Sequence, residues 1–314
     1  MRPDSLEIFI LTYNRSGYLK ELLSCLAHQT VSGFKVIILD NASNDDTAFV
    51  ASEFKRLGYK FRSNLKNIGG AGNFQLAQEL SSKEYVMILH DDDLIHPSYV
   101  EDSIRLITNF SIAPSLIGSK MVFTDRPEFH FWKNLNSNKK VIFSESQREF
   151  ATLLYDGFPL HFGSVIYKTS ILKKINWNKE VYGKMADRPF LIDVAGHGSV
   201  FVFDYPYVQY RVHGGQDSST KSSGPFQSEL LALHKMYFSI LGGNILTKGG
   251  RAFVKNIFCN LKNESLSIDI RLVEYCRTAI QKEAASYLTL FLSVIFFLFK
   301  IPGNCFRKII AKIL

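Results

Sequence analysis

Short apolar runs alternate with amphipathic segments along the first hundred residues of the chain. The runs that predict β-strands cover residues 6–12, 35–40, 59–63 and 84–89. Between them, apolar residues recur every three or four positions, as the leucines of residues 19–26 do, and this spacing predicts helices. Strands that alternate with helices form βαβ units, so the pattern predicts an α/β fold with a mostly parallel sheet flanked by helices.

Further elements are expected downstream of these runs. One helix should end at Gly58, another should cover residues 73–80, and a third should open at Pro97, because proline suits a first helical turn. Residues 131–140 are predicted to form an exposed loop and residues 162–168 a strand.

The character of the chain changes near residue 220. The segment "DSSTKSSGP" is rich in turn-forming residues, and from about residue 225 the apolar spacing is helical only. We therefore expect an α/β domain over residues 1–220 and a helical C-terminal region over residues 221–314.

The composition is that of a folded protein. Of the 314 residues, 46% are hydrophobic and 21% are charged, whereas a disordered chain would have less apolar content and more charge. The four cysteines are far apart and show no CxxC spacing, so neither a zinc knuckle nor a disulfide framework is predicted. The apolar stretch near the N-terminus is too short for a secretory signal, and we expect a cytoplasmic protein.

The end of the chain combines apolar and basic residues. No charged residue occurs in 284–299, and the last fifteen residues carry basic side chains but no acidic ones. A net charge of +8 alone would permit a nucleic-acid partner, but a basic end joined to an apolar run points to an anionic membrane surface. We expect the tail, about 284–314, to hold the protein peripherally at the inner face of the cell membrane, with no nucleic-acid partner. The alternative is a core helix that packs on the first domain.

Carboxylates follow two of the predicted strands. Asp40 ends the second strand, and three consecutive aspartates, Asp91, Asp92 and Asp93, follow the fourth. Ligands of parallel sheets bind at the carboxyl ends of the strands, and clustered carboxylates there suit Mg²⁺ or Mn²⁺. The alternative is that the aspartates cap the helix that opens near Pro97, a role for which one of them would suffice.

Four segments, in order, resemble the family 2 glycosyltransferases with the GT-A fold. They are "IFILTYNR", "IILDNASNDDT", "NIGGAGN" and "HDDD" with a proline four residues further on. The resemblance covers about residues 6–215. It implies a metal-dependent inverting transferase that moves a sugar from a nucleotide-diphosphate donor, with a UDP-sugar favoured. The implied acceptor is a glycan or a lipid-linked glycan in the synthesis of a bacterial surface polysaccharide.

The resemblance also assigns roles to residues around the donor. The expected donor contacts are Thr12, Tyr13, Asn14, Arg15, Asp40, Asn67, Gly70, Asn73, Asp91, Asp92 and Arg211. The triplet matches the family's DXD motif, with Asp93 favoured as the direct ligand of Mn²⁺ or Mg²⁺ and Asp91 as a second. In many relatives an aspartate stands where this chain has His90.

Two further segments complete the predicted site. In "KMADRPF" the family's usual Glu-Asp pair reads Ala186-Asp187, so Asp187 is the candidate catalytic base, with a helix N-cap as its alternative role. Asp193 is a weaker candidate. In "YRVHGG", His213 matches a histidine that reaches the metal or the diphosphate, and Arg211 offers a fork of donors to a phosphate.

Two other classes of protein remain open at this point. A sugar-phosphate nucleotidyltransferase shares the parallel sheet and the carboxylates, but "LTYNRSGYLKE" lacks the glycine- and lysine-rich phosphate loop of that class. A non-catalytic protein that binds membrane surfaces would account for the positive charge and would leave the aspartates without a role.

Overall fold

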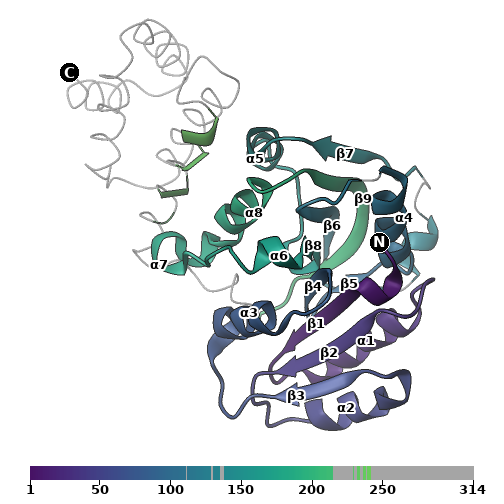
Figure 1. Ribbon diagram of the computed structural model, residues 1–314. Coiled ribbons are helices and arrows are strands. Elements are labelled where there is room, and N and C mark those ends of the chain that lie inside the picture. The colour runs from purple at the N-terminus through teal and green to yellow at the C-terminus, as the bar shows by residue number, and fades with distance from the viewer. Residues whose placement is uncertain are drawn as a thin grey trace, which may run out of the picture. The chain divides into compact units, whose positions relative to one another are not determined.

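The computed structural model describes residues 1–110, 112–128, 130–134 and 138–214, and further along residues 229, 232–233, 236–237 and 239–241 (Figure 1). The chain divides into two compact units. One contains Met1–Phe150 and Phe158–Ser223, and the other contains Ala151–Gly157 and Gly224–Leu314. The candidate site lies entirely in the first unit.

One mixed sheet forms the centre of the first unit. Its strands are β1 (Leu6–Thr12), β2 (Lys35–Asp40), β3 (Lys60–Ser63), β4 (Tyr85–His90), β5 (Leu94–Ile95), β6 (Leu116–Thr124), β7 (Val141–Ser144), β8 (Ile166–Lys168) and β9 (Val200–Arg211). The order is β3-β2-β1-β4-β8-β6-β9-β5, and β7 pairs with β9. The four neighbouring strands β3, β2, β1 and β4 are parallel, as predicted. Beyond β4 the sheet is mixed, because β8 runs antiparallel to both β4 and β6.

Helices flank the sheet (Figure 1). They are α1 (Ser16–Ala27), α2 (Thr47–Glu53), α3 (Gly69–Leu80), α4 (Tyr99–Phe110), α5 (Gln147–Tyr155), α6 (Thr169–Leu172), α7 (Lys179–Tyr182) and α8 (Asp187–Ala195). Short 3₁₀ helices are η1 (Pro3–Ser5), η2 (Lys55–Leu57), η3 (Phe131–Asn134), η4 (Phe162–Ser164) and η5 (Gly183–Met185). The predicted leucine stripe of α1 is fully buried in the main core, together with apolar residues of β1, β2, β4 and α4.

An aromatic cluster joins α3, η4 and α8. The ring of Phe74 lies 5.2 Å from Phe162, 5.0 Å from Trp177 and 5.4 Å from Phe190. Packed aromatic rings contribute about 0.5–1.5 kcal/mol per pair beyond their buried area. The cluster therefore fixes where α8 begins relative to η4.

The segment expected to be an exposed loop, residues 131–140, differs from the prediction. Its first four residues form η3, and Trp132 is buried. The indole Nε1 donates a hydrogen bond to the carbonyl of Pro206 at 2.7 Å. The prediction was wrong there because it followed the polar residues around Trp132. Burial of this one large indole removes enough apolar surface from water to hold the segment against the domain.

The strand predicted at residues 162–168 is also shorter than expected. Only Ile166–Lys168 pair in β8, and Phe162–Ser164 form η4. The predicted helix at 73–80 in turn begins earlier, at Gly69, whose φ of +75° favours glycine. Both differences lie at the carboxyl edge of the sheet, where the backbone turns to form the site.

The predicted membrane-associating tail, about residues 284–314, lies outside the described residues, as does most of the helical region expected after 225. Within the part of the chain that is described, no helix has the length and apolar content needed to cross a bilayer. Association of the tail with a membrane surface stays a prediction.

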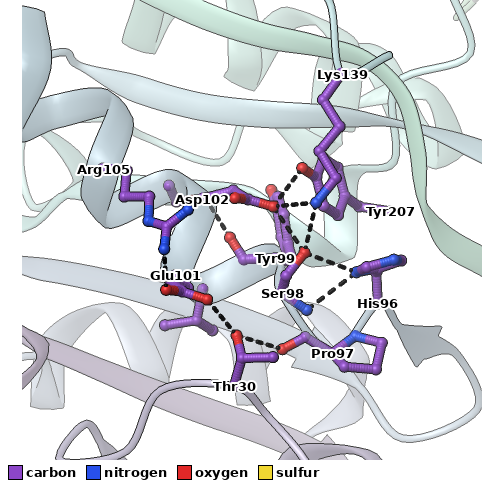
Figure 2. A network of polar contacts seen from close by, with 12 residues as sticks. Thr30, His96, Pro97, Ser98, Tyr99, Glu101, Asp102, Arg105, Lys139 and Tyr207 are labelled. Carbon is purple, nitrogen blue, oxygen red and sulfur yellow. Dashed lines mark hydrogen bonds and ion pairs between the residues drawn. The ribbon is translucent and has the colours of Figure 1, made fainter. Parts of the chain in front are cut away.

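Asp102 of α4 is the centre of a polar network that ties α4 to β9 (Figure 2). Its Oδ2 accepts hydrogen bonds from Ser98 Oγ at 2.7 Å, Tyr207 hydroxyl at 2.7 Å and Lys139 Nζ at 2.6 Å. Burial opposes the ionisation of Asp102, but these three donors outweigh it and lower the pKa of the carboxyl. Beside them, His96 Nδ1 accepts the backbone N–H of Ser98 at 3.0 Å.

The pH dependence of stability should report on His96. Burial and the Lys139 cation, against a smaller effect of Asp102, lower the pKa of His96 from 6.5 to about 4. Between these values the unfolded chain binds a proton that the folded chain does not, so the free energy of unfolding should fall as the pH drops from about 6.5 toward 4. His96→Asn keeps an acceptor for Ser98 and removes this titration.

Thermal denaturation of both proteins across this pH window measures the effect. The melting temperature of His96→Asn should decline less steeply than that of the wild type. Equal slopes would show that His96 titrates normally in the folded state.

Candidate active site

Three parallel strands end side by side at one edge of the sheet. Thr12 at the end of β1 is opposite Asp40 at the end of β2, and Leu11 is opposite His90 at the end of β4. Asp40 and the aspartate triplet therefore lie at the same edge, as the sequence predicted. Loops that follow parallel strands are the common position of a nucleotide site in such folds.

The three aspartates are buried, and side chains from two distant segments contact them. Arg15 NH1, in the loop after β1, lies 2.8 Å from Asp92 Oδ2 and 3.3 Å from Asp91 Oδ1. His213 Nε2, just after β9, lies 3.0 Å from Asp92 Oδ2. The structure thus brings together the predicted residues Arg15 and His213 around Asp92.

Arg211 fixes the other end of the triplet. Its backbone N–H donates to Asp93 Oδ1 at 2.9 Å, and its Nε donates to the carbonyl of Asp92 at 2.8 Å. The guanidinium lies 4.3 Å from the ring centre of Tyr18 in α1 and forms an ion pair with Glu21 of the same helix. Arg211 is therefore buried and bonded to residues around the site, whereas the side chain of Arg15 is partly exposed.

The carboxyl groups differ in how readily they ionise. Burial, and then the neighbouring negative charge of Asp92, raise the pKa of Asp91 to about 7. Burial also opposes the ionisation of Asp92, but His90, His213 and Arg15 outweigh it and lower its pKa. Asp92 therefore ionises more readily than Asp91.

The donor set of this edge fits a divalent cation. Among the described residues, the buried Oδ2 of Asp91 has no hydrogen-bond partner. The ligating atoms of His90, Asp93 and His161 all lie within 4.8 Å of one another. The carboxylate oxygens suit both Mn²⁺ and Mg²⁺, whereas imidazole nitrogens are ligands of transition metals rather than of Mg²⁺.

His161 is a site residue for which no role was predicted. Its Nε2 lies 2.8 Å from Asp93 Oδ2, and both side chains are buried. Its backbone N–H bonds to the carbonyl of Ser119 in β6. A histidine directly before a predicted strand was the available signal. It carried no weight because the antiparallel direction of β8, which returns residue 161 to the end of β4, is not visible in sequence.

Asp187 is the first residue of α8, on the side of the sheet that η4 occupies. Its Oδ1 accepts the backbone N–H of Arg188 at 2.8 Å, and the N-cap position belongs to Ala186. Burial, opposed mainly by Arg188 and more weakly by the charge of His161, raises the pKa of Asp187. Asp193, the weaker candidate, lies further along α8 with its pKa also raised by burial.

The predicted donor residues after β1 and β2 form one connected loop pair. The backbone N–H of Asn14 donates to Ser43 Oγ, and Asn14 Oδ1 accepts the N–H of Asn44, both at 2.8 Å. Asn14 has a φ of 51°, a conformation that asparagine tolerates better than most residues. Tyr13 beside it is exposed, and the buried Asp40 carboxylate accepts the N–H of Ser43. These loops border a surface that a ligand can reach.

The predicted donor residues Asn67 and Asn73 shape the loop around Gly70. Asn67 Oδ1 accepts hydrogen bonds from Asn41 Nδ2 at 2.8 Å and from the N–H of Gly69 at 2.7 Å. Asn73 is buried, and its Nδ2 donates to the carbonyl of Leu39 at 3.0 Å. Both amides thus hold α3 against β2, and direct contact with a donor stays a prediction for them and for Gly70.

Comparison with known proteins agrees with this architecture. Residues 7–175, more than half of the chain, match the family described as Glycosyl transferase family 2. A protein of Haemophilus influenzae named as an uncharacterized glycosyltransferase is 24% identical over 225 residues, which cover 68% of this chain and 67% of that protein. EpsH of Bacillus subtilis, a putative glycosyltransferase, is 24% identical over 161 residues, which span less than half of its length, 46%, and 46% of this chain.

Crystal structures of the 1–349 fragment of Staphylococcus aureus TarS share the fold. One superposes with a TM-score of 0.60 and 18% identity, over 88% of this chain and 80% of the fragment. A second, in complex with UDP-GlcNAc, gives a TM-score of 0.56 and 18% identity, over 98% of this chain and 79% of the fragment. The expected GT-A fold is thereby confirmed. With a family match over more than half of its length, this chain belongs to the family 2 glycosyltransferases.

Proposed function

We propose that the protein transfers a sugar from a UDP-sugar to a hydroxyl of a glycan or lipid-linked glycan, with inversion, in the synthesis of a bacterial surface polysaccharide. The observation that carries the proposal is the buried aspartate triplet with Arg15, Arg211 and His213 around it. The TarS structure that holds UDP-GlcNAc supports the choice of nucleotide. TarS is named as a poly(ribitol-phosphate) beta-N-acetylglucosaminyltransferase, which supports a surface polymer as the acceptor class.

The donor diphosphate would bind beside the triplet. Arg15 is the partly exposed cation there, with 30% of its side chain accessible, so its guanidinium can reorient from the aspartates to a phosphate. Asp93, Asp91 and His213 would hold Mn²⁺ or Mg²⁺, and His161 beside Asp93 is a further candidate ligand. When bound, the cation offsets the negative charge that develops on the departing diphosphate. Thr12, Tyr13, Asn14 and Asp40 border the position of the nucleoside.

Asp187 would act as the general base. Its raised pKa makes the carboxylate a stronger base than that of an exposed aspartate. The acceptor oxygen attacks the anomeric carbon, its proton passes to the carboxylate of Asp187, and the bond between that carbon and the diphosphate oxygen breaks. One displacement from the opposite face inverts the configuration and needs no covalent intermediate.

Replacement of Asp93 tests the metal assignment. Asp93→Asn removes the charge and leaves the shape, so the fold should be retained. Mn²⁺ should raise the affinity of the wild type for UDP, and calorimetry should show this gain reduced by at least about tenfold in the variant. Loss of a residue that only supports a metal ligand already costs about tenfold or more in metal affinity, so loss of a ligand itself should cost at least as much.

Asp204→Asn is the matched control, because it removes a carboxylate that pairs with Lys120 at 3.0 Å. Its Mn²⁺-dependent UDP affinity should equal that of the wild type. An Asp93→Asn protein with the wild-type response to Mn²⁺ would show that the metal is held elsewhere.

Replacement of Asp187 separates catalysis from donor binding. Asp187→Asn should bind UDP with Mn²⁺ as the wild type does and should lose transfer by roughly 10²–10⁴-fold, the usual contribution of a general base. Asp193→Asn, in the same helix, should keep normal turnover. If instead Asp193→Asn is inactive and Asp187→Asn is active, the roles of the two aspartates are reversed.

A methyl group at Gly163 tests the position of His161. A Cβ there would lie 2.9 Å from His90 Nδ1 and 3.0 Å from His161 Cε1, so at least one imidazole must move. Gly163→Ala should therefore weaken Mn²⁺ binding without nucleotide, by roughly tenfold, as measured by electron paramagnetic resonance. Gly17→Ala, whose Cβ would meet nothing within 4 Å, is the control. Equal Mn²⁺ affinities in all three proteins would separate His161 from the metal site.

A further inference from the structure

Phe123, next to last in β6, exposes a large aromatic ring close to the site. It is 62% exposed, although the first four residues of its strand are buried. In the parallel pairing of β6 with β9, Phe123 is opposite Tyr210, and their ring centres are 5.4 Å apart at an interplanar angle of 74°. The neighbouring Val212 is also exposed, at 48%. Apolar surface of this kind at a strand end is a candidate contact for a ligand.

The ring pair is continuous with the reaction site. The ring centre of Tyr210 lies 5.5 Å from that of His161, whose Nε2 lies 2.8 Å from Asp93. The next residue in β9, Arg211, donates its N–H to the same carboxylate. Phe123, Tyr210 and His161 therefore form a row of rings, here called the aromatic row, that leads from the surface to Asp93.

The aromatic row lies on the face of the sheet opposite α1. Side chains of a strand alternate between faces, and Arg211, which follows Tyr210, packs on Tyr18 of α1. On the row's side, His161 leads directly into η4, which packs on α8 through the contact of Phe162 with Phe190 at 5.9 Å. The row thus shares its face with α8, the helix that begins at Asp187.

The aromatic row lies several strands away from the loops expected to bind the nucleoside. Between β1, where the predicted donor residues begin, and β6 lie β4 and β8. At about 4.8 Å between neighbouring strands, β6 is roughly 14 Å from β1. A ligand that stacks on Phe123 would therefore lie apart from the nucleoside, on the part of the edge next to His161 and Asp93.

We propose that Phe123 and Tyr210 form an acceptor subsite that stacks on a sugar ring of the glycan acceptor. The inference rests on the proposed transfer function, because only an acceptor gives a sugar ring reason to lie there. One face of a pyranose ring presents mainly C–H groups, which pack on the electron-rich face of an aromatic ring while the hydroxyls stay in water. A saccharide fits the exposed row better than an apolar protein segment does, since the row is narrow and is bordered by the polar groups of the site.

The test uses the full-length protein and an array of immobilised bacterial-type oligosaccharides, with UDP and Mn²⁺ present. Phe123→Ala should bind the glycans retained by the wild type about tenfold more weakly, a difference of about 1.4 kcal/mol. Phe123→Tyr should restore binding, because it restores the ring. The matched control is Phe110→Ala, since Phe110 is 53% exposed and pairs with Phe201 at the other end of β9, with ring centres 5.2 Å apart.

Affinity for UDP, measured separately by calorimetry, should be equal in all four proteins. A wild type that does not bind UDP would overturn the proposed function itself. A wild type that binds UDP but none of the glycans, or a Phe123→Ala protein that binds them normally, would overturn the subsite alone.

Discussion

Three adjacent buried carboxylates are the constraint on which the rest of this site depends. An unpaired buried charge costs several kcal/mol, and three in a row repel one another as well. The fold meets this cost with Arg15 and His213 at Asp92 and with the N–H of Arg211 at Asp93. The part of this cost that these partners do not offset raises the pKa of Asp91. The site is thus held ready for additional positive charge.

The mixed half of the sheet positions Arg211 and His213 beside the triplet. The triplet fills the gap between β4 and β5, and the two-residue β5 pairs with β9 at Leu94 and Gln209. β9 then continues to Arg211, and His213 follows just after its end. Segments about 120 residues apart in sequence are therefore joined by one short antiparallel pairing, and the parallel half supplies the nucleotide edge beside them. The polar network around Asp102 secures the same strand further back, through Tyr207.

The two faces of the sheet give the site its chemical asymmetry. On the α1 side, the Arg211 guanidinium packs on the ring of Tyr18 and forms an ion pair with Glu21. On the other side, His161 lies directly before η4 and Asp187 is the first residue of α8. The aromatic cluster around Phe74 holds these two helices together. Family membership removes the two alternatives left open by the sequence, a nucleotidyltransferase and a non-catalytic binding protein.

The sequence by itself determined the parallel strands, the edge at which Asp40 and the triplet meet, and the family, because apolar periodicity and short motifs are local properties of a chain. It did not reveal His161, the buried Trp132 or the pairing of Phe123 with Tyr210. Each of these depends on which distant strands lie side by side and in which direction: β8 antiparallel to β4, and β9 beside β6. Pairing is a non-local choice that follows from total burial, so only the tertiary structure decided it.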